Sequence, residues 1–338
     1  MRIAVDVMGG DHGCGVIVDG VIQALNQLAG LETAILVGRE PDILKAFETR
    51  TIDPARLKIQ HADEVLAMDD RPMDAVRRKK DCSITVGVNL LKQGEADAFL
   101  SPGNTGGVVT ASTVKLRRLP GLERAGIATV LPTPQNDFVL LDAGANVDSK
   151  PIHLAHYAVM GNVYAREILG IPNPRVGILS VGTEDIKGND LTLEAFSLCK
   201  QLDLNFVGNV EGHDLFSNRV DVVVCDGFVG NVVLKSCESL AQNLFSWLRE
   251  ELTAGPVRKI GALMAKGAFR TIKRRMDPDA YGGAPLLGLN SNVFIAHGSA
   301  GAKAVKNAIR MTYSAFDHQI NQQMTEAISM ANEKMEIA

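Results

Sequence analysis

Short apolar runs alternate with helix-length segments along most of the chain. The runs occupy residues 3–7, 33–37, 57–59, 96–100, 138–141, 176–179, 206–207, 220–225 and 293–296. Segments between them, such as residues 16–28 and 108–116, have the composition of helices. Apolar strands that alternate with helices are typical of a mostly parallel sheet covered on both faces. The pattern therefore predicts an α/β protein with a three-layer α/β/α sandwich.

The chain after residue 230 departs from this rhythm. Residues 230–252 have a helical pattern and residues 256–276 a second, amphipathic one, so a helical projection is expected over residues 235–276. The glycine-rich residues 281–292 are expected to form a loop, and the residues from 301 onward a closing helix. Because the sequence contains no Pro/Ser-rich linker, we expect residues 1–338 to form a single two-lobed α/β domain.

Composition narrows the class of protein. With 46% hydrophobic and 22% charged residues, and no apolar run of about 18 residues, the chain is expected to be cytoplasmic. A net charge of -4 argues against a nucleic-acid binder. The five cysteines form no Cys-x-x-Cys pair, and His153 and His156 have no third ligand at a metal-site spacing. No metal is therefore expected.

Polar, glycine-containing turns follow many of the predicted strands. In Ser101-Pro102-Gly103-Asn104-Thr105-Gly106-Gly107, the glycines allow close backbone approach, and Asn104 or Thr105 can cap the following helix. The first amides of that helix suit an anion such as phosphate. Similar turns lie at residues 6–11, 142–146, 180–189, 226–231, 281–288 and 297–299. Because turns that follow parallel strands lie on one edge of a sheet, together they predict a single polar cleft.

Common nucleotide and hydrolase signatures are absent from this sequence. No Gly-x-Gly-x-x-Gly follows the first strand, and neither a P-loop nor a Gly-x-Ser-x-Gly elbow occurs. Cys225 ends an apolar run, which favours a packing role over a nucleophilic one. A dinucleotide cofactor or a protein nucleophile is therefore not expected.

Six motifs in the polar turns carry a resemblance to a known family. They are Asp6-Val7-Met8-Gly9-Gly10-Asp11, Gly103-Asn104-Thr105-Gly106, Asp142 with Gly144-Ala145-Asn146, Gly182 with Glu184 and Lys187-Gly188, Gly227-Phe228 with Gly230-Asn231, and residues 281–288. In this order, from Met1 to beyond Ser299, they resemble the bacterial phosphate acyltransferases of phospholipid synthesis. The resemblance implies an isopropylmalate-dehydrogenase-like fold, a homodimer without a cofactor, and conversion of fatty acyl-[acyl-carrier-protein] and inorganic phosphate into acyl phosphate.

The resemblance also assigns candidate site residues. Phosphate can itself attack the thioester, so the protein has to position it and stabilise the oxyanion. Lys187, Asn231 and Asn104 are the expected catalytic donors, although Lys187 could be a solvated loop residue and Asn231 a helix cap. The expected substrate-binding residues are Asp6, Gly9, Gly10, Asp11, Gly103, Thr105, Gly106, Asp142, Asn146, Asp226, Gly282 and Gly283. His12 and His297 are optional proton handlers.

Residues 256–276 contain seven basic residues and no acidic one. This segment could bind an anionic membrane surface, dock the acidic acyl carrier protein, or pack at a dimer interface. Arg77-Arg78-Lys79-Lys80 is a competing patch for the carrier. A membrane-bound glycerol-phosphate acyltransferase is a further possible partner of a peripherally membrane-associated enzyme.

Two other classes of function stay open on sequence grounds. Fold analogy alone suggests a β-decarboxylating dehydrogenase, and a non-catalytic scaffold that binds acyl carrier protein or membrane is the second alternative.

Overall fold

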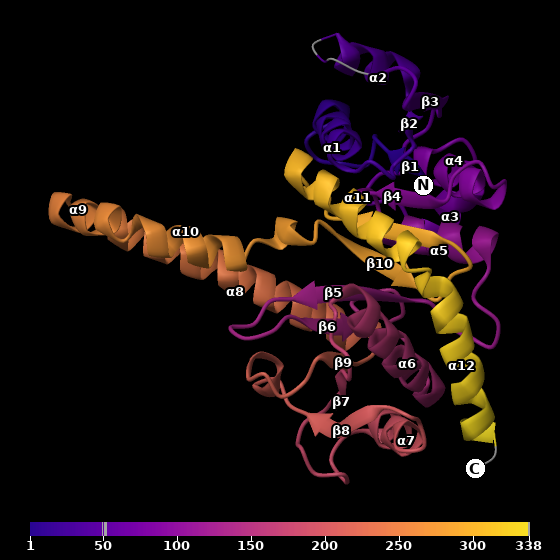
Figure 1. Ribbon diagram of the computed structural model, residues 1–338, viewed down its shortest axis with the longest axis vertical. Coiled ribbons are helices and arrows are strands. Elements are labelled where there is room, and N and C mark those ends of the chain that lie inside the picture. Colours follow the sequence, from indigo (N-terminus) through magenta and orange to yellow (C-terminus); the bar gives the residue numbers. More distant parts are fainter. Residues whose placement is uncertain (49, 51–52, 337–338) are drawn as a thin grey trace.

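The computed structural model describes residues 1–48, 50 and 53–336. This part of the chain forms an 11-stranded sheet with the strand order β3-β2-β1-β4-β11-β10-β5-β6-β9-β7-β8 (Figure 1). The strands are β1 (Arg2–Asp6), β2 (Thr33–Gly38), β3 (Leu57–His61), β4 (Ala98–Ser101), β5 (Gly126–Leu131), β6 (Phe138–Leu141), β7 (Arg175–Leu179), β8 (Asn205–Val210), β9 (Val222–Val224), β10 (Gly283–Leu287) and β11 (Asn292–Ala296). Each predicted apolar run coincides with a strand.

The two halves of the sheet run in opposite directions. β1, β2, β3, β4 and β11 are mutually parallel, and β6, β9, β7 and β8 form a second parallel set. Between the two sets, β11 to β10, β10 to β5 and β5 to β6 are antiparallel. An odd number of reversals separates the sets, so their carboxyl ends lie at opposite edges of the sheet.

Two central strands depart from the sequence expectation. β10 occupies part of residues 281–292, which were expected to form a loop, and β5 was not predicted. Glycine and proline in β10 are typical of a turn. Its second half is nevertheless buried, and Leu286 and Leu287 pair with Ile127 and Gly126 of β5. Burial between neighbouring strands outweighs the local turn signal here.

Helices cover both faces of the sheet, which confirms the three-layer sandwich. One layer contains α1 (Cys14–Gln27), α2 (Glu40–Phe47), α6 (Pro151–Ile168), α7 (Asp190–Cys199), α11 (Ala302–Asp317) and α12 (Ile320–Glu336). The other contains α3 (Pro72–Arg78), α4 (Ser83–Lys92), α5 (Thr105–Leu116) and the start of α8 (Gly227–Thr253). Short 3-10 turns lie at Asp214–Phe216 and Pro278–Ala280. The expected closing helix is two helices, because Gln319 has a positive φ of 51° between α11 and α12.

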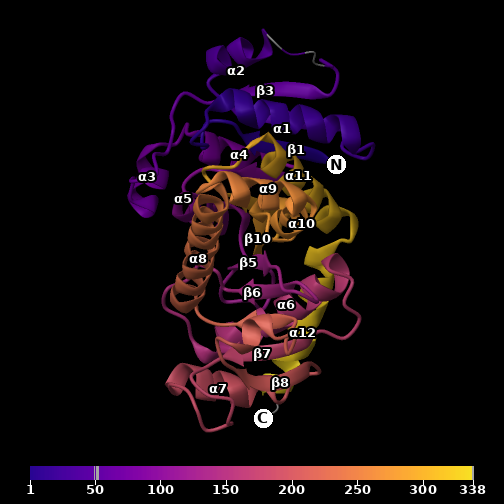
Figure 2. The same cartoon turned by 90° about the vertical axis from the view of Figure 1, so that its left-hand side faces the viewer.

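A helical arm protrudes from the sandwich. It consists of α8 beyond the sheet, α9 (Pro256–Met264) and α10 (Lys266–Arg275). Figure 1 shows these helices extending to the left of the sheet, and Figure 2 views the molecule from the side on which the arm protrudes. Beyond its first turns α8 has no buried residue, and α9 and α10 have none. The protruding helical segment of the prediction is thus present, starting within a longer helix.

Candidate active site

The loops after β1 and β4 meet at a buried carboxylate. Asp6 is fully buried at the end of β1; its Oδ2 accepts from Ser101 Oγ at 2.7 Å, and its Oδ1 accepts from Met8 N at 3.0 Å. Ser101 Oγ also accepts from Gly103 N at 3.0 Å. Burial raises the pKa of Asp6, while hydrogen bonds from Ser101 and its other donors oppose that shift. This network joins the two loops.

The two loops touch through backbone that tolerates no side chain. A Cβ on Gly9 would lie 2.5 Å from Gly103 Cα, so a residue larger than glycine would separate the loops. The loop after β11 joins them, since Asp11 N donates to Gly298 O at 2.8 Å. The three loops form the first polar cluster, which contains Asp6, Gly9, Gly10, Asp11, Gly103, Thr105 and Gly106.

Asn104 is the N-cap of α5, as the sequence indicates. Its Oδ1 accepts from Gly107 N at 2.9 Å, and its Nδ2 donates to Ala67 O and Met68 O, each at 3.0 Å. The side chain is buried and both ends of its amide are engaged. These contacts favour a positioning role for Asn104 over the oxyanion donor that the sequence predicts. The amides of Thr105 and Gly106 precede the first helical hydrogen bonds of α5 and can bind an anion.

A second polar cluster forms around Asp142, after β6. The fully buried carboxylate accepts from the amides of Ile127, Gly144, Ala145 and Asn146 at 2.8–3.0 Å. Burial raises the pKa of Asp142, and the same donors oppose that shift. Because its acceptor sites face backbone donors, Asp142 holds the loop in shape.

Asn146 and Asp226 attach the start of α8 to this cluster. Asn146 Nδ2 donates to Tyr157 Oη at 2.9 Å, and Asn146 O accepts from Gly227 N at 2.8 Å. Asp226 is the N-cap of α8 and accepts from the amides of Phe228 and Val229 at 2.9 Å. Asn231 is therefore not the cap of α8. It lies exposed one turn into the helix, where its side chain is beside Gly144.

Lys187 lies in the loop after β7. Its backbone oxygen accepts from Ser180 Oγ and Asn209 Nδ2, both at 3.1 Å, which fixes the loop, while its side chain is exposed. Within residues 1–48, 50 and 53–336, no hydrogen bond or ion pair engages Lys187 Nζ. The ammonium group is therefore available to a ligand.

The structure corrects the expectation of a single cleft along one edge. The first polar cluster lies at the carboxyl ends of β1, β4 and β11, and the second at those of β6 and β9, on the opposite edge. Asn104 thus belongs to the first cluster, whereas Asn231 and Lys187 follow β9 and β7 of the other parallel set. Val108 and Ala111 of α5 belong to the same apolar core cluster as Ala143 and the half-buried Leu234 of α8.

The predicted binding residues Gly282 and Gly283 lie at the start of β10, where this strand packs against α11. Gly282 has a φ of +72°, and a Cβ there would lie 2.1 Å from Ala304 O. Gly283 pairs with Ala296, the residue before His297. These glycines allow α11 to approach the sheet closely. Two residues with structural roles in the first cluster, Ser101 and Gly298, were not singled out from sequence, although both lie in quoted loops.

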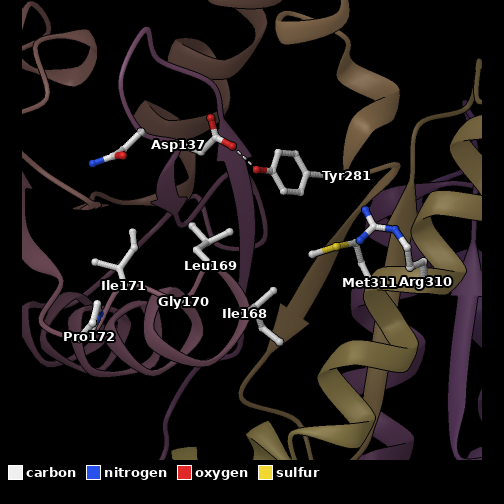
Figure 3. A pocket seen from close by; sticks show the side chains of 10 residues that line it. Asp137, Ile168, Leu169, Gly170, Ile171, Pro172, Tyr281, Arg310 and Met311 are labelled. Carbon is white, nitrogen blue, oxygen red and sulfur yellow. Dashed lines mark hydrogen bonds between the residues drawn. The ribbon is translucent and has the colours of Figure 1, made fainter.

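A separate pocket lies on the helical layer that contains α6 and α11. It has a volume of about 500 Å³ between the β5–β6 connection, the end of α6 and α11. In Figure 3, Tyr281 points toward Asp137 across its mouth, and Tyr281 Oη donates to that carboxylate. None of the candidate catalytic residues lines it.

Two further candidate features are absent from the described residues. No group of three or more His, Cys, Asp or Glu side chains is placed to hold a metal ion within residues 1–48, 50 and 53–336. None of the helices described is long and apolar enough to cross a bilayer.

The sandwich has the fold of two solved phosphotransacetylases. It is similar to a phosphotransacetylase from Streptococcus pyogenes, with a TM-score of 0.64 and 20% identity over 94% of each chain. A phosphotransacetylase from Staphylococcus aureus aligns with a TM-score of 0.57 and 17% identity, covering 93% of this chain and 94% of that one. At these identities the likeness establishes the fold.

Sequence comparison establishes the family. Residues 1–323 match the family described as "Fatty acid synthesis protein", and the chain belongs to it. The phosphate acyltransferase of Desulfitobacterium hafniense is 51% identical over 92% of both chains. That of Akkermansia muciniphila is 44% identical over 100% of this chain and 99% of its own. The protein is therefore an enzyme of the phosphate acyltransferase type, which sets aside the dehydrogenase and scaffold alternatives.

Proposed function

We propose that this enzyme transfers a fatty acyl group from acyl carrier protein to inorganic phosphate and supplies acyl phosphate to phospholipid synthesis. The observation that carries the proposal is the first polar cluster, where the open amides of Thr105 and Gly106 begin α5 beside the Asp6–Ser101 network. An anion is stabilised at such a helix start by the amides and by the helix dipole. Membership of a family that contains phosphate acyltransferases supports phosphate as that anion.

The reaction needs no nucleophile from the protein. A phosphate oxygen attacks the thioester carbonyl carbon, and the resulting tetrahedral oxyanion collapses with cleavage of the carbon–sulfur bond. The products are acyl phosphate and the carrier thiolate, which then takes up a proton. A thiol with a pKa of about 8.5 is a good leaving group, so strong general acid help is not required. The protein contributes position and charge stabilisation.

We assign separate roles to the two polar clusters. The first binds phosphate, with Asn104 holding the α5 start in place. Asn231 and Lys187, on the second cluster and the neighbouring loop, contact the acyl donor. Their exposed side chains support this role.

The arm supports two further proposals. α9 and α10 contain no acidic residue and present exposed apolar side chains. Met264 and Val257 have exposed fractions of 85% and 80%. We propose that this part of the arm binds an anionic membrane surface from the cytoplasm. Exposed Leu240, Leu244 and Trp247 on α8 suit the interface of a homodimer.

Membrane contact has a chemical purpose. Acyl phosphate carries a long apolar chain, so release beside the bilayer passes it to a membrane-bound acyltransferase that uses glycerol phosphate. The proposal therefore includes such an enzyme as the next partner.

One assay tests the proposed reaction. Acyl-carrier thioester is incubated with the protein, with and without inorganic phosphate, and both free carrier thiol and acyl phosphate trapped as its hydroxamate are measured. Phosphate-dependent formation of both products in equal amounts is expected. Carrier binding without phosphate-dependent thioester loss would contradict the proposal.

A further inference from the structure

A basic groove lies on the surface between α3, α4 and α5. Its volume is about 500 Å³. The lining consists of Met73, Val76, Arg77, Lys80, Thr85, Asn89, Thr110, Val114 and Lys115. Three of these side chains are cationic, three are apolar, and none is a carboxylate. The groove thus combines a positive rim with an apolar surface.

The cations of this groove are free to bind a partner. Arg77 and Lys80 are exposed, and within the described part of the chain neither makes an ion pair or a side-chain hydrogen bond. Lys115 Nζ donates to Asn89 Oδ1 at 2.9 Å, which directs it across the groove without neutralising it. Lys79 differs, because its ammonium group pairs with Asp70 and donates to Val65 O. Of the four basic residues 77–80, Lys79 is therefore already paired within the protein and offers no free charge to a partner.

Two of the three apolar side chains in the groove are exposed. Met73 has an exposed fraction of 54% and Val114 one of 69%. Apolar side chains that lie between unpaired cations are typical of a surface that a partner covers, with the charges steering it and the apolar contacts holding it.

The groove and the proposed phosphate site share one helix, α5. α5 forms one wall, and the first turn of that helix provides the open amides at Thr105 and Gly106. α3 begins at Pro72, which packs closely against Gly106. A Cβ on Gly106 would lie 2.5 Å from Pro72 Cγ. A partner that fills the groove is thus held beside the place where phosphate binds.

We infer that this groove docks the acyl carrier protein through an acidic helix with an apolar centre. The inference rests on the proposed function and selects the α3–α5 surface over the arm for the carrier. The carrier is acidic, so its charge complements Arg77, Lys80 and Lys115. Docking there brings its prosthetic arm to the α5 start, where the thioester meets phosphate.

The test is the double variant Arg77→Glu and Lys80→Glu, assayed against Lys266→Glu and Arg270→Glu on the arm, which makes the same change in charge. In the groove variant we expect the KM for acyl carrier to rise at least about tenfold, with kcat at saturating carrier within about twofold of wild type. The wild-type KM should rise with added salt, and the groove variant should lose most of that dependence. The arm variant should keep the wild-type KM.

Each other outcome overturns the inference. An unchanged KM in the groove variant would remove the carrier from this surface, and a raised KM in the arm variant alone would place it on the arm. A fall in kcat without a change in KM would make the groove part of the chemistry. If charge reversal prevents folding, Arg77→Gln with Lys80→Gln carries the same test. Absence of phosphate-dependent thioester loss in the wild type would instead refute the proposed function.

Discussion

Replacing Asn104 by alanine separates two roles for this residue. Its Oδ1 caps α5 at Gly107 N, and its Nδ2 donates to Ala67 O and Met68 O. Loss of an N-cap costs about 1 kcal/mol of unfolding free energy. Each part-buried carbonyl left without its donor costs about 1–3 kcal/mol, less where water replaces it. We therefore expect Asn104→Ala to destabilise the protein by about 2–4 kcal/mol.

The same change should weaken phosphate binding. The amides of Thr105 and Gly106 are held in place by this cap, and a loss of about 1.4 kcal/mol corresponds to a tenfold change in affinity. We expect the KM for phosphate to rise by about tenfold, with a smaller effect on kcat. Asn104→Asp provides the comparison, because it keeps the cap acceptor but places a negative charge beside the anion site and cannot donate to Ala67 O.

Denaturant unfolding and phosphate titration together decide the role. If Asn104→Ala keeps wild-type stability and phosphate KM but loses kcat, its amide acts directly on the oxyanion and the positioning role is wrong. If stability and all kinetic constants are unchanged, neither role holds.

Three other predictions follow from the site, the arm and one ion pair. Lys187→Ala and Asn231→Ala should each fold normally and lower turnover by at least about tenfold, since losing one donor that holds the acyl substrate in the transition state costs a few kcal/mol; wild-type turnover in both would remove them from the mechanism. Co-sedimentation with anionic vesicles should weaken with salt, be poor with neutral vesicles, and disappear when glutamine replaces four basic residues of the arm, Arg258, Lys259, Lys266 and Arg270; persistence in that variant would refute membrane binding through these charges. Burial raises the pKa of Asp221, but its hydrogen bonds from Arg175 outweigh burial and hold that pKa below its ordinary value. The pair therefore stabilises the fold above the unfolded pKa of about 3.9, and that stability is lost as pH falls through the lower folded pKa. Urea unfolding should show Arg175→Leu far less stable than wild type at pH 7 and a smaller gap near pH 3; an equal gap at both pH values would contradict the linkage.

Local features of the fold were readable from sequence. Nine apolar runs identify nine strands, and the N-cap at Asn104 follows from the preference of asparagine for that position. Apolar periodicity and capping act within a few residues, so the amino-acid order contains them directly. β5 carried a similar signal in Ile127-Ala128-Thr129-Val130, which the sequence interpretation did not use.

Strand direction was not readable in the same way. The reversal between β11 and β6 depends on β10, whose Gly283-Ala284-Pro285 start is typical of a turn. A strand with that composition is stable because β11 and β5 pair with it on either side. No local pattern encodes those partners. The prediction from sequence therefore put every polar loop on one edge of the sheet, whereas the structure distributes the loops over two edges.

The divided site gives α5 more than one function. Its first turn offers amides at Thr105 and Gly106, and its outer surface forms a wall of the basic groove. Its inner surface, at Val108 and Ala111, packs in the cluster that also contains Ala143 of the second polar cluster. Buried packing transmits displacement because interiors have little free volume. A shift of α5 on carrier docking would therefore move the phosphate amides, which couples the basic groove to the phosphate site through one helix.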